Sequence, residues 1–199
     1  MQTALQKHTK SRGVGLQTKV NIHNRFDFEF RDAITGEKTG KYEGTYAENI
    51  VLDQMYTRLC ARSSYFVNIH FGTGTGTLSA ARTSLFTHLG TKTAVNDAQS
   101  KALPTSWWRR KIVLNPEEYV GSALSEVGVA YGSTSSNLVT HALIKDINGN
   151  PITLTKTALD VVIIYATVYV TFSTTDSSIA LCGMPNSNAL VNYLIGGTE

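Results

Sequence analysis

Alternation of apolar and polar residues dominates the first ordered-looking part of this chain. Apolar side chains recur there at nearly every second position: Val20, Ile22, Phe26, Phe28 and Phe30. Because successive side chains of a strand point to opposite faces, this spacing predicts a strand over about residues 17–31 with one buried face. Residues 32–37 then predict a turn, and residues 38–44 a returning second strand.

The period changes from two to about 3.6 after Thr45. Thr45 and Glu48 stand three residues apart, the spacing at which both side chains can bond the free backbone N–H groups of a helix start. Apolar residues follow at helical spacing: Val51, Leu52, Met55, Tyr56 and Leu59. The pattern predicts a helix over about residues 46–61, capped by Thr45, with this stripe on the core.

A glycine-rich stretch interrupts the β pattern in the middle of the chain. Residues 65–71 resemble a strand, and they run directly into Gly72, Gly74 and Gly76, which alternate with threonine. So many glycines in a short stretch predict a loop. The residues that follow, up to Pro104, are mostly polar, so the sequence predicts an irregular excursion over about residues 71–104.

Strand patterns return after Trp107. Residues 109–114, 123–131 and 138–145 are each bounded by turn-forming residues. The pair Asn148-Gly149 favours a tight hairpin turn, so residues 138–145 are expected to pair with residues 152–155.

The last strong pattern, residues 161–172, predicts a strand with two different faces. One face is apolar and expected in the core: Val162, Ile164, Ala166, Val168, Val170 and Phe172. The other is amphipathic: Ile163, Tyr165, Thr167, Tyr169 and Thr171. An aromatic and threonine-rich outer face is compatible with cover by another sheet or another subunit.

Repeated short strands with one early helix predict a mainly β fold. The expected architecture is an antiparallel β-sandwich, jelly-roll-like, with one inserted helix and long loops. A single domain over residues 17–175 is expected, with a flexible N-terminal arm at 1–16 and a C-terminal arm or short strand at 176–199.

The composition of the chain bears on two possible partners, nucleic acid and a membrane. Charged residues make up only 17% of the chain, and the formal net charge of +3 is small. A dense basic face of the kind that binds nucleic acid is therefore not expected. The longest apolar run, residues 161–170, is about half of the roughly 20 residues that a membrane helix needs, so no membrane span is predicted.

Known catalytic and cofactor motifs are not found in the sequence. The glycine run lacks the Gly-Lys-Ser/Thr ending of a phosphate-binding loop, and Glu117 and Glu118 would point to opposite faces of a strand. We therefore expect no enzyme activity and no cofactor. The five histidines lack metal-ligand spacing, so no metal site is expected; His70 and His88, which flank the glycine-rich excursion, are the first candidates should a ligand exist.

One short motif mixes aromatic and basic residues. Trp107 and Trp108 precede Arg109, Arg110 and Lys111, a combination also found where bases or sugars stack. On a strand the two tryptophans face opposite sides. The simpler interpretation is one buried tryptophan and one at a sheet edge or subunit contact.

Parts of the amino-acid sequence resemble virion proteins of tailed bacteriophages. The resemblance lies in residues 20–90, above all in 26–32, 48–52 and 69–76. Residues 124–129, followed by the Asn-Gly-Asn-Pro-Ile hairpin and an apolar strand, are similar to β-sandwich modules of phage tail fibres and baseplates. The resemblance implies a component of a particle and covers about two thirds of the chain.

The expected function is that of a non-enzymatic virion structural protein. It would be made in the host cytoplasm, form homo-oligomers and join other virion proteins in a tail or baseplate. The candidate subunit-contact residues are Gly72, Gly74, Gly76, Leu85, Phe86, Leu89, Trp107 and Trp108. Two alternatives remain open: a receptor- or glycan-binding module of a tail fibre, and an icosahedral coat protein.

Overall fold

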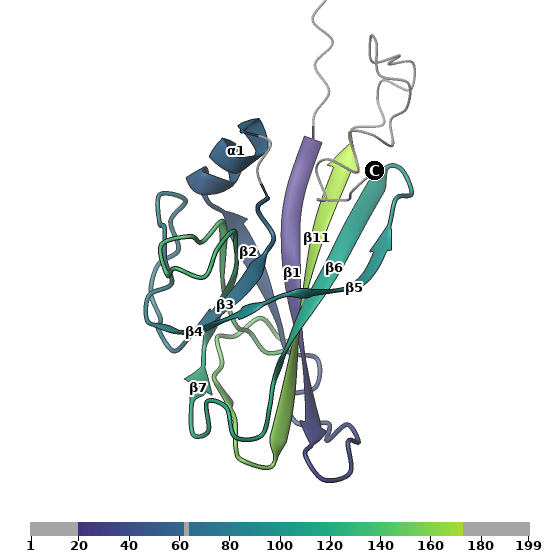
Figure 1. Ribbon diagram of the computed structural model, residues 1–199, viewed down its shortest axis with the longest axis vertical. Helices are drawn as coiled ribbons and strands as arrows, with labels where there is room; N and C mark the ends of the chain where they lie inside the picture. Colours follow the sequence, from purple (N-terminus) through teal and green to yellow (C-terminus); the bar gives the residue numbers. More distant parts are fainter. Residues whose placement is uncertain (1–19, 62–63, 173–199) are drawn as a thin grey trace, which may run out of the picture.

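The computed structural model describes residues 20–61 and 64–172, and it is mainly β with one helix (Figure 1). Both arms expected at the termini lie outside the described residues. The elements, in chain order, are β1 (Val20–Asp32), β2 (Tyr46–Val51), α1 (Asp53–Cys60), β3 (Asn68–Gly72), β4 (His88–Thr93), β5 (Val95–Ser100), β6 (Thr105–Leu114), β7 (Ala123–Leu124), β8 (Glu126–Ala130), β9 (Thr140–Leu143), β10 (Leu154–Thr155) and β11 (Asp160–Phe172). The predicted antiparallel, mainly β fold with one helix is confirmed.

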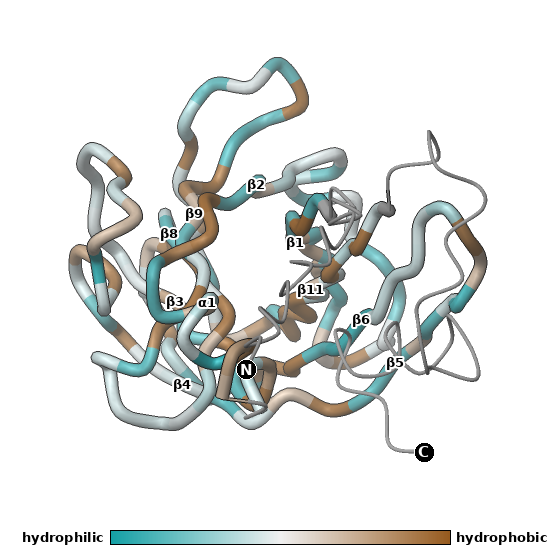
Figure 2. The backbone as a smooth tube through the Cα atoms, turned by 90° about the horizontal axis from the view of Figure 1, so that it is seen from above, coloured by the Kyte–Doolittle hydropathy of each residue, from teal (hydrophilic) through white to brown (hydrophobic). Residues whose placement is uncertain are grey.

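One curled sheet provides both layers of the expected sandwich. Its strand order is β4-β3-β8-β9-β2-β1-β11-β6-β5, while β10 and β7 form a separate pair. Strand β2 turns one corner, because its first half pairs with β1 and its second half with β9. Strands β4 and β5 turn the other corner, since only Ala94 separates them and they pair with β3 and β6. Seen from above, the chain therefore runs round a ring (Figure 2).

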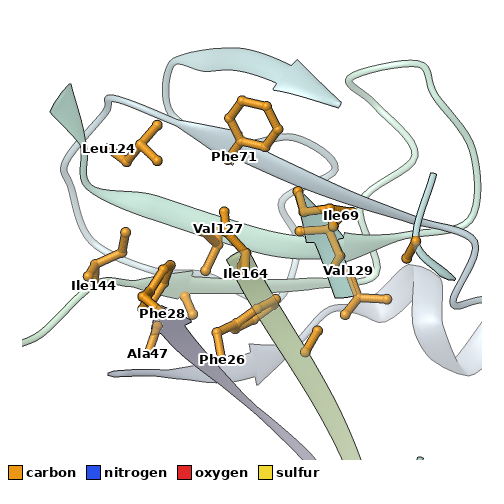
Figure 3. Close-up of a cluster of buried hydrophobic side chains, with 14 of the residues drawn as sticks. Phe26, Phe28, Ala47, Ile69, Phe71, Leu124, Val127, Val129, Ile144 and Ile164 are labelled. Carbon is orange, nitrogen blue, oxygen red and sulfur yellow. The ribbon is translucent and has the colours of Figure 1, made fainter. Parts of the chain in front are cut away.

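The core fills the inside of this ring. Phe26 of β1 and Ile164 of β11 are buried on one side, and Ile69 of β3 and Val127 of β8 face them from the other (Figure 3). The alternation predicted for the last strand is confirmed at five positions, each at most 2% exposed: Val162, Ile164, Ala166, Val168 and Val170. The longest ladder joins β1 to β11, from Val20↔Phe172 to Asp32↔Asp160.

The helix predicted over 46–61 is wrong in its first half. Tyr46–Val51 is strand β2, and the helix is limited to Asp53–Cys60. Leu52 stands at the N-cap without a side-chain cap bond, so Thr45 caps no helix. Pairing of this segment with both β1 and β9 satisfies its backbone and buries Ala47 completely, and these long-range contacts outweigh the local helical spacing.

Two other strand predictions also need correction. Residues 38–44 form no strand: a single bridge joins Lys38 to Arg31, and turns follow in which Gly40 and Tyr42 have positive φ. The turn around Gly149 is confirmed, with φ of 84° and a bond from Asp146 N to Asn150 O. The strands beyond it separate after the Lys145–Pro151 bridge, because Leu154–Thr155 pairs with β7 instead.

The irregular excursion predicted over 71–104 is shorter in the structure. Strands β4 and β5 occupy its second half, so only residues 73–87 form a long loop. The sequence of β5 is polar and shows no strand pattern. This strand pairs with the edge of β6, where both of its faces can stay partly exposed, so no alternation of apolar residues is needed.

Candidate assembly surface

The outer face of β1, β11 and β6 carries aromatic residues in register across the strands. Because side chains alternate, the residues opposite the core positions of these strands all point outward. Strand pairing sets Tyr169 of β11 between His23 and Trp107. Four residues along, it sets Tyr165 between Asp27 and Lys111. We call this outer face the long-strand face.

An apolar stripe follows β11 down the middle of the long-strand face. Its half-buried members on β11 and β6 are Val161, Ile163, Tyr165, Tyr169, Trp107 and Val113. His23 stacks on Tyr169 with ring centroids 4.9 Å apart and planes 9° from parallel. The Arg109 guanidinium lies 5.2 Å from the centre of the Tyr165 ring. Aromatic side chains and arginine are enriched at protein interfaces.

Ion pairs flank the stripe on both sides. On β1, Arg25 Nε lies 2.9 Å from Asp27 Oδ1. Beyond the stripe, Arg109 Nε and Lys111 Nζ lie 2.6 Å and 2.9 Å from the two oxygens of Asp97. Partial burial opposes ionisation of Asp97, but its bonds to Lys111 and Arg109 outweigh burial and lower the pKa of this carboxyl.

The two tryptophans lie on opposite sides of β6, as the strand pattern predicts. Trp108 turns inward and packs edge to face on Phe66, with ring centroids 5.2 Å apart. Trp107 turns outward beside Tyr169 and keeps part of its surface exposed. Trp108 is also only partly buried, so what distinguishes the two is direction: Trp107 is the one that lies on the long-strand face.

Three of the predicted contact positions are packed against their own chain. Gly72 at the end of β3 is buried, and so are Gly74 and Leu85 in the glycine-rich loop, residues 73–87. A Cβ at Gly74 would stand 2.4 Å from the Phe86 Cβ and 2.6 Å from Glu126 Oε1, so glycine is needed for this close approach. The other loop candidates keep exposed surface: Gly76, Phe86 and, on β4, Leu89.

A buried carboxylate holds this loop on the sheet. Glu126 is fully buried, and its Oε1 accepts bonds from the N–H groups of Gly74 and Thr87 at 2.9 and 2.7 Å. Its Oε2 accepts bonds from Phe86 N and His141 Nε2, each at 2.8 Å. Burial opposes ionisation of Glu126, but these four donors outweigh it and lower the pKa of the carboxyl below 4.5.

Sequence reasoning missed this Glu126–His141 pair. The sequence did contain one sign of it: Glu126 is a charged residue within the largely apolar segment 123–131. A buried strand carries a charged residue only when that residue is paired. The partners lie 15 residues away for His141 and 52 for Gly74, distances that no local pattern spans.

His70 and His88 do lie side by side, with ring centroids 5.0 Å apart. His70 Nε2 is 2.9 Å from Gly132 O, and burial lowers the pKa of His70 to about 4. His88 Nε2 is 2.9 Å from Thr91 Oγ1. Within the described residues, no three His, Cys, Asp or Glu side chains are grouped as a metal ion would require.

Comparison of this chain with known proteins found no relative. No family model, no curated protein and no solved structure matches this chain. Over residues 20–61 and 64–172, no helix is long and apolar enough to cross a membrane.

Proposed function

We propose that this protein is a non-enzymatic structural subunit of a virion, joined to neighbouring subunits through the long-strand face. The observation that carries the proposal is the arrangement of this face: a half-buried apolar stripe with Tyr165, Tyr169 and Trp107, bordered by ion pairs on both flanks. Protein interfaces have the same anatomy, an apolar centre rich in aromatic residues within a polar rim.

The placement in a tail or baseplate rests on the resemblance of the sequence to tailed-phage virion proteins. The low share of charged residues, 17%, also suits a surface that neighbours cover. Glu126 and His141 are both fully buried and bonded to each other, so this acid–base pair holds the fold together and is not open to a substrate.

A glycan-binding module is the second candidate, favoured by the same aromatic row. His23, Tyr169 and Trp107 present rings side by side on an exposed sheet, and flat rings of this kind can stack on a sugar. The continuation of the stripe through Ile163 and Val113 favours a protein partner instead, because these side chains offer no polar group to a hydroxyl-rich ligand.

The proposal is tested by measuring assembly directly. Light scattering of the protein should give a mass of at least twice the 21.7 kDa of one chain, and an antibody to it should label tailed particles from cells that carry the gene. Ile163→Asp places a charge in the apolar stripe without entering the core, so it should reduce association and leave the melting temperature nearly unchanged.

The control for this variant is Tyr56→Ser, which changes a side chain 57% exposed on α1. It should assemble as the parent protein does. A protein that stays monomeric at every concentration, and whose antibody labels no particle, would show the proposal to be wrong.

A further inference from the structure

We infer that the N-terminal segment of one copy of this chain, residues 1–19, docks on the opposite end of the next copy and joins the two head to tail. The inference goes beyond the proposed function, because it concerns a different surface from the long-strand face. It follows from the exposed apolar side chains and the free charges at one end of the molecule.

Three turns form that end of the molecule, at the bottom of Figure 1. They are residues 33–37 after β1, residues 115–121 after β6 and residues 156–159 before β11. Backbone bonds tie them to one another, from Ala33 N to Leu159 O and from Gly121 N to Lys156 O, each at 2.9 Å. We call this surface the loop end.

Each turn of the loop end exposes one large apolar side chain. Ile34 is 83% exposed, Val120 50% and Leu159 60%. Single exposed apolar residues are common, but three at one end of a molecule mark a surface that contacts another molecule. The loop end therefore suits a partner that brings apolar side chains of its own.

The charge that remains free at the loop end is negative. Glu37 and Glu117 are exposed, and neither forms an ion pair within the described residues. Glu118 and, next to the first turn, Lys38 are already in ion pairs, and Lys156 is buried. An acidic surface repels anionic lipids, nucleic acid and a second loop end alike. The partner is therefore cationic.

Residues 1–19 have the matching chemistry. This segment lies outside the described residues, and its sequence contains no aspartate or glutamate. Its cations and its larger aliphatic side chains are Lys7, Lys10, Arg12 and Lys19, and Leu5, Val14 and Leu16. Such a segment brings apolar side chains and positive charge to a surface that offers exposed apolar side chains and negative charge.

The place where this segment joins the fold selects a neighbouring copy. The segment ends at Val20, and β1 runs from there to Asp32, so about 40 Å of strand separates it from the loop end of its own chain. To reach that end it must run back along the whole strand, whereas a copy stacked end to end offers its loop end directly. Such a head-to-tail contact repeats from copy to copy and builds a ring or a filament.

Charge reversal on either side tests this contact in the full-length chain. The loop-end variant carries Glu37→Lys and Glu117→Lys, and the segment variant carries Lys7→Glu, Lys10→Glu and Arg12→Glu. By sedimentation velocity, each variant alone should associate at least about tenfold more weakly than the parent protein, because like charges then meet at every contact. In a 1:1 mixture, the reversed segment of one variant meets the reversed loop end of the other, so association should return. Recovery on mixing also shows that both variants are folded.

A peptide with the sequence of residues 1–19 tests the partner directly. Fluorescence anisotropy should show that it binds the segment variant, whose loop end is unchanged, and binds the loop-end variant at least about tenfold more weakly. Adding Glu43→Lys to the segment variant is the matched control, because Glu43 is exposed but lies outside the loop end, and it should leave peptide binding unchanged. Ile163→Asp alters only the long-strand face, so its effect on association decides the proposed function and not this inference.

Three results would overturn the inference. One is a peptide that binds neither variant, or binds both equally. Another is a mixture that stays dissociated although both variants melt as the parent protein does, which is also the result expected if the segment docks on its own chain. The third is a single-stranded oligonucleotide that binds the parent protein but not the segment variant, while the peptide ignores the loop end; the segment would then serve nucleic acid.

Discussion

Glu126 is a single residue whose ionised form holds two ends of one loop. Its carboxylate accepts bonds from Gly74, Phe86 and Thr87 of the loop and from His141 of β9. A glutamine at this position would offer these four donors only one neutral oxygen, because its other terminal atom is an NH2 group that cannot accept. Some of the buried N–H groups would therefore lose their acceptor.

Glu126→Gln should therefore lower the free energy of unfolding by roughly 2–4 kcal/mol, measured by urea denaturation at pH 7. Because the pKa of Glu126 is lower in the folded state, its stabilisation is present above the unfolded value of 4.5 and is lost as the pH falls through the folded pKa. The variant should lack that acid-dependent loss. Glu43→Gln, at an exposed position, is the control and should change little.

His70 should affect stability in a different pH range. Its folded pKa of about 4 lies below the ordinary 6.5, so between these values the unfolded chain binds a proton that the folded chain does not. Stability should then fall by about 1.4 kcal/mol per pH unit as the pH decreases from 6.5 to 4.

Comparing His70→Gln with the parent protein isolates this contribution, because glutamine can still donate a bond to Gly132 O. The difference in unfolding free energy between the two proteins should change with pH in that range. A constant difference for His70→Gln would mean that folding does not lower the pKa of His70.

At the scale of elements, α1 depends on its buried contacts rather than on a cap. Leu52 directly precedes the helix and packs, fully buried, with Leu85, Ala130 and Leu138. The sequence predicted the importance of Leu52 for the wrong reason, as a residue on a long helical stripe. The segment before it is a strand that pairs on both sides.

Leu52→Ala should cost about 2–5 kcal/mol of unfolding free energy, because it opens a cavity beneath the glycine-rich loop. Tyr56→Ala, on the exposed side of α1, should stay within about 0.5 kcal/mol of the parent. Thr45→Ala should show no effect that comes from helix capping, since the helix begins after Leu52. Thermal melts followed by circular dichroism should show a much lower melting temperature for Leu52→Ala and almost no change for Tyr56→Ala.

For the whole molecule, closure of the ring rests on the corner at Ala94. Arg110 of β6 reaches across it and donates bonds to the backbone oxygens of Phe66 and Ala94. These bonds tie β6 to the corner. They act beside the bond from Lys92 Nζ of β4 to Val113 O of β6 and the bond from Ala94 N to Val67 O.

Arg110→Ala should leave both carbonyls without this donor and cost roughly 1–3 kcal/mol. Hydrogen exchange should accelerate first in β4 and β5, because these strands form the corner. Lys101→Ala, at an exposed position before β6, is the control. Unchanged exchange in β4 and β5 would show that the corner is held by other contacts.

The sequence alone determined the features that depend on near neighbours. Alternation located β1 and β11 and separated the core face of β11 from its aromatic outer face, because side-chain direction follows from position along a strand. It also located the turn at Gly149. Only the tertiary structure decided that residues 46–51 form a strand, that one sheet closes both layers, and that Glu126 meets Gly74 across 52 residues. Each of these depends on a partner far along the chain, and pairing with that partner outweighs the local preference of the segment.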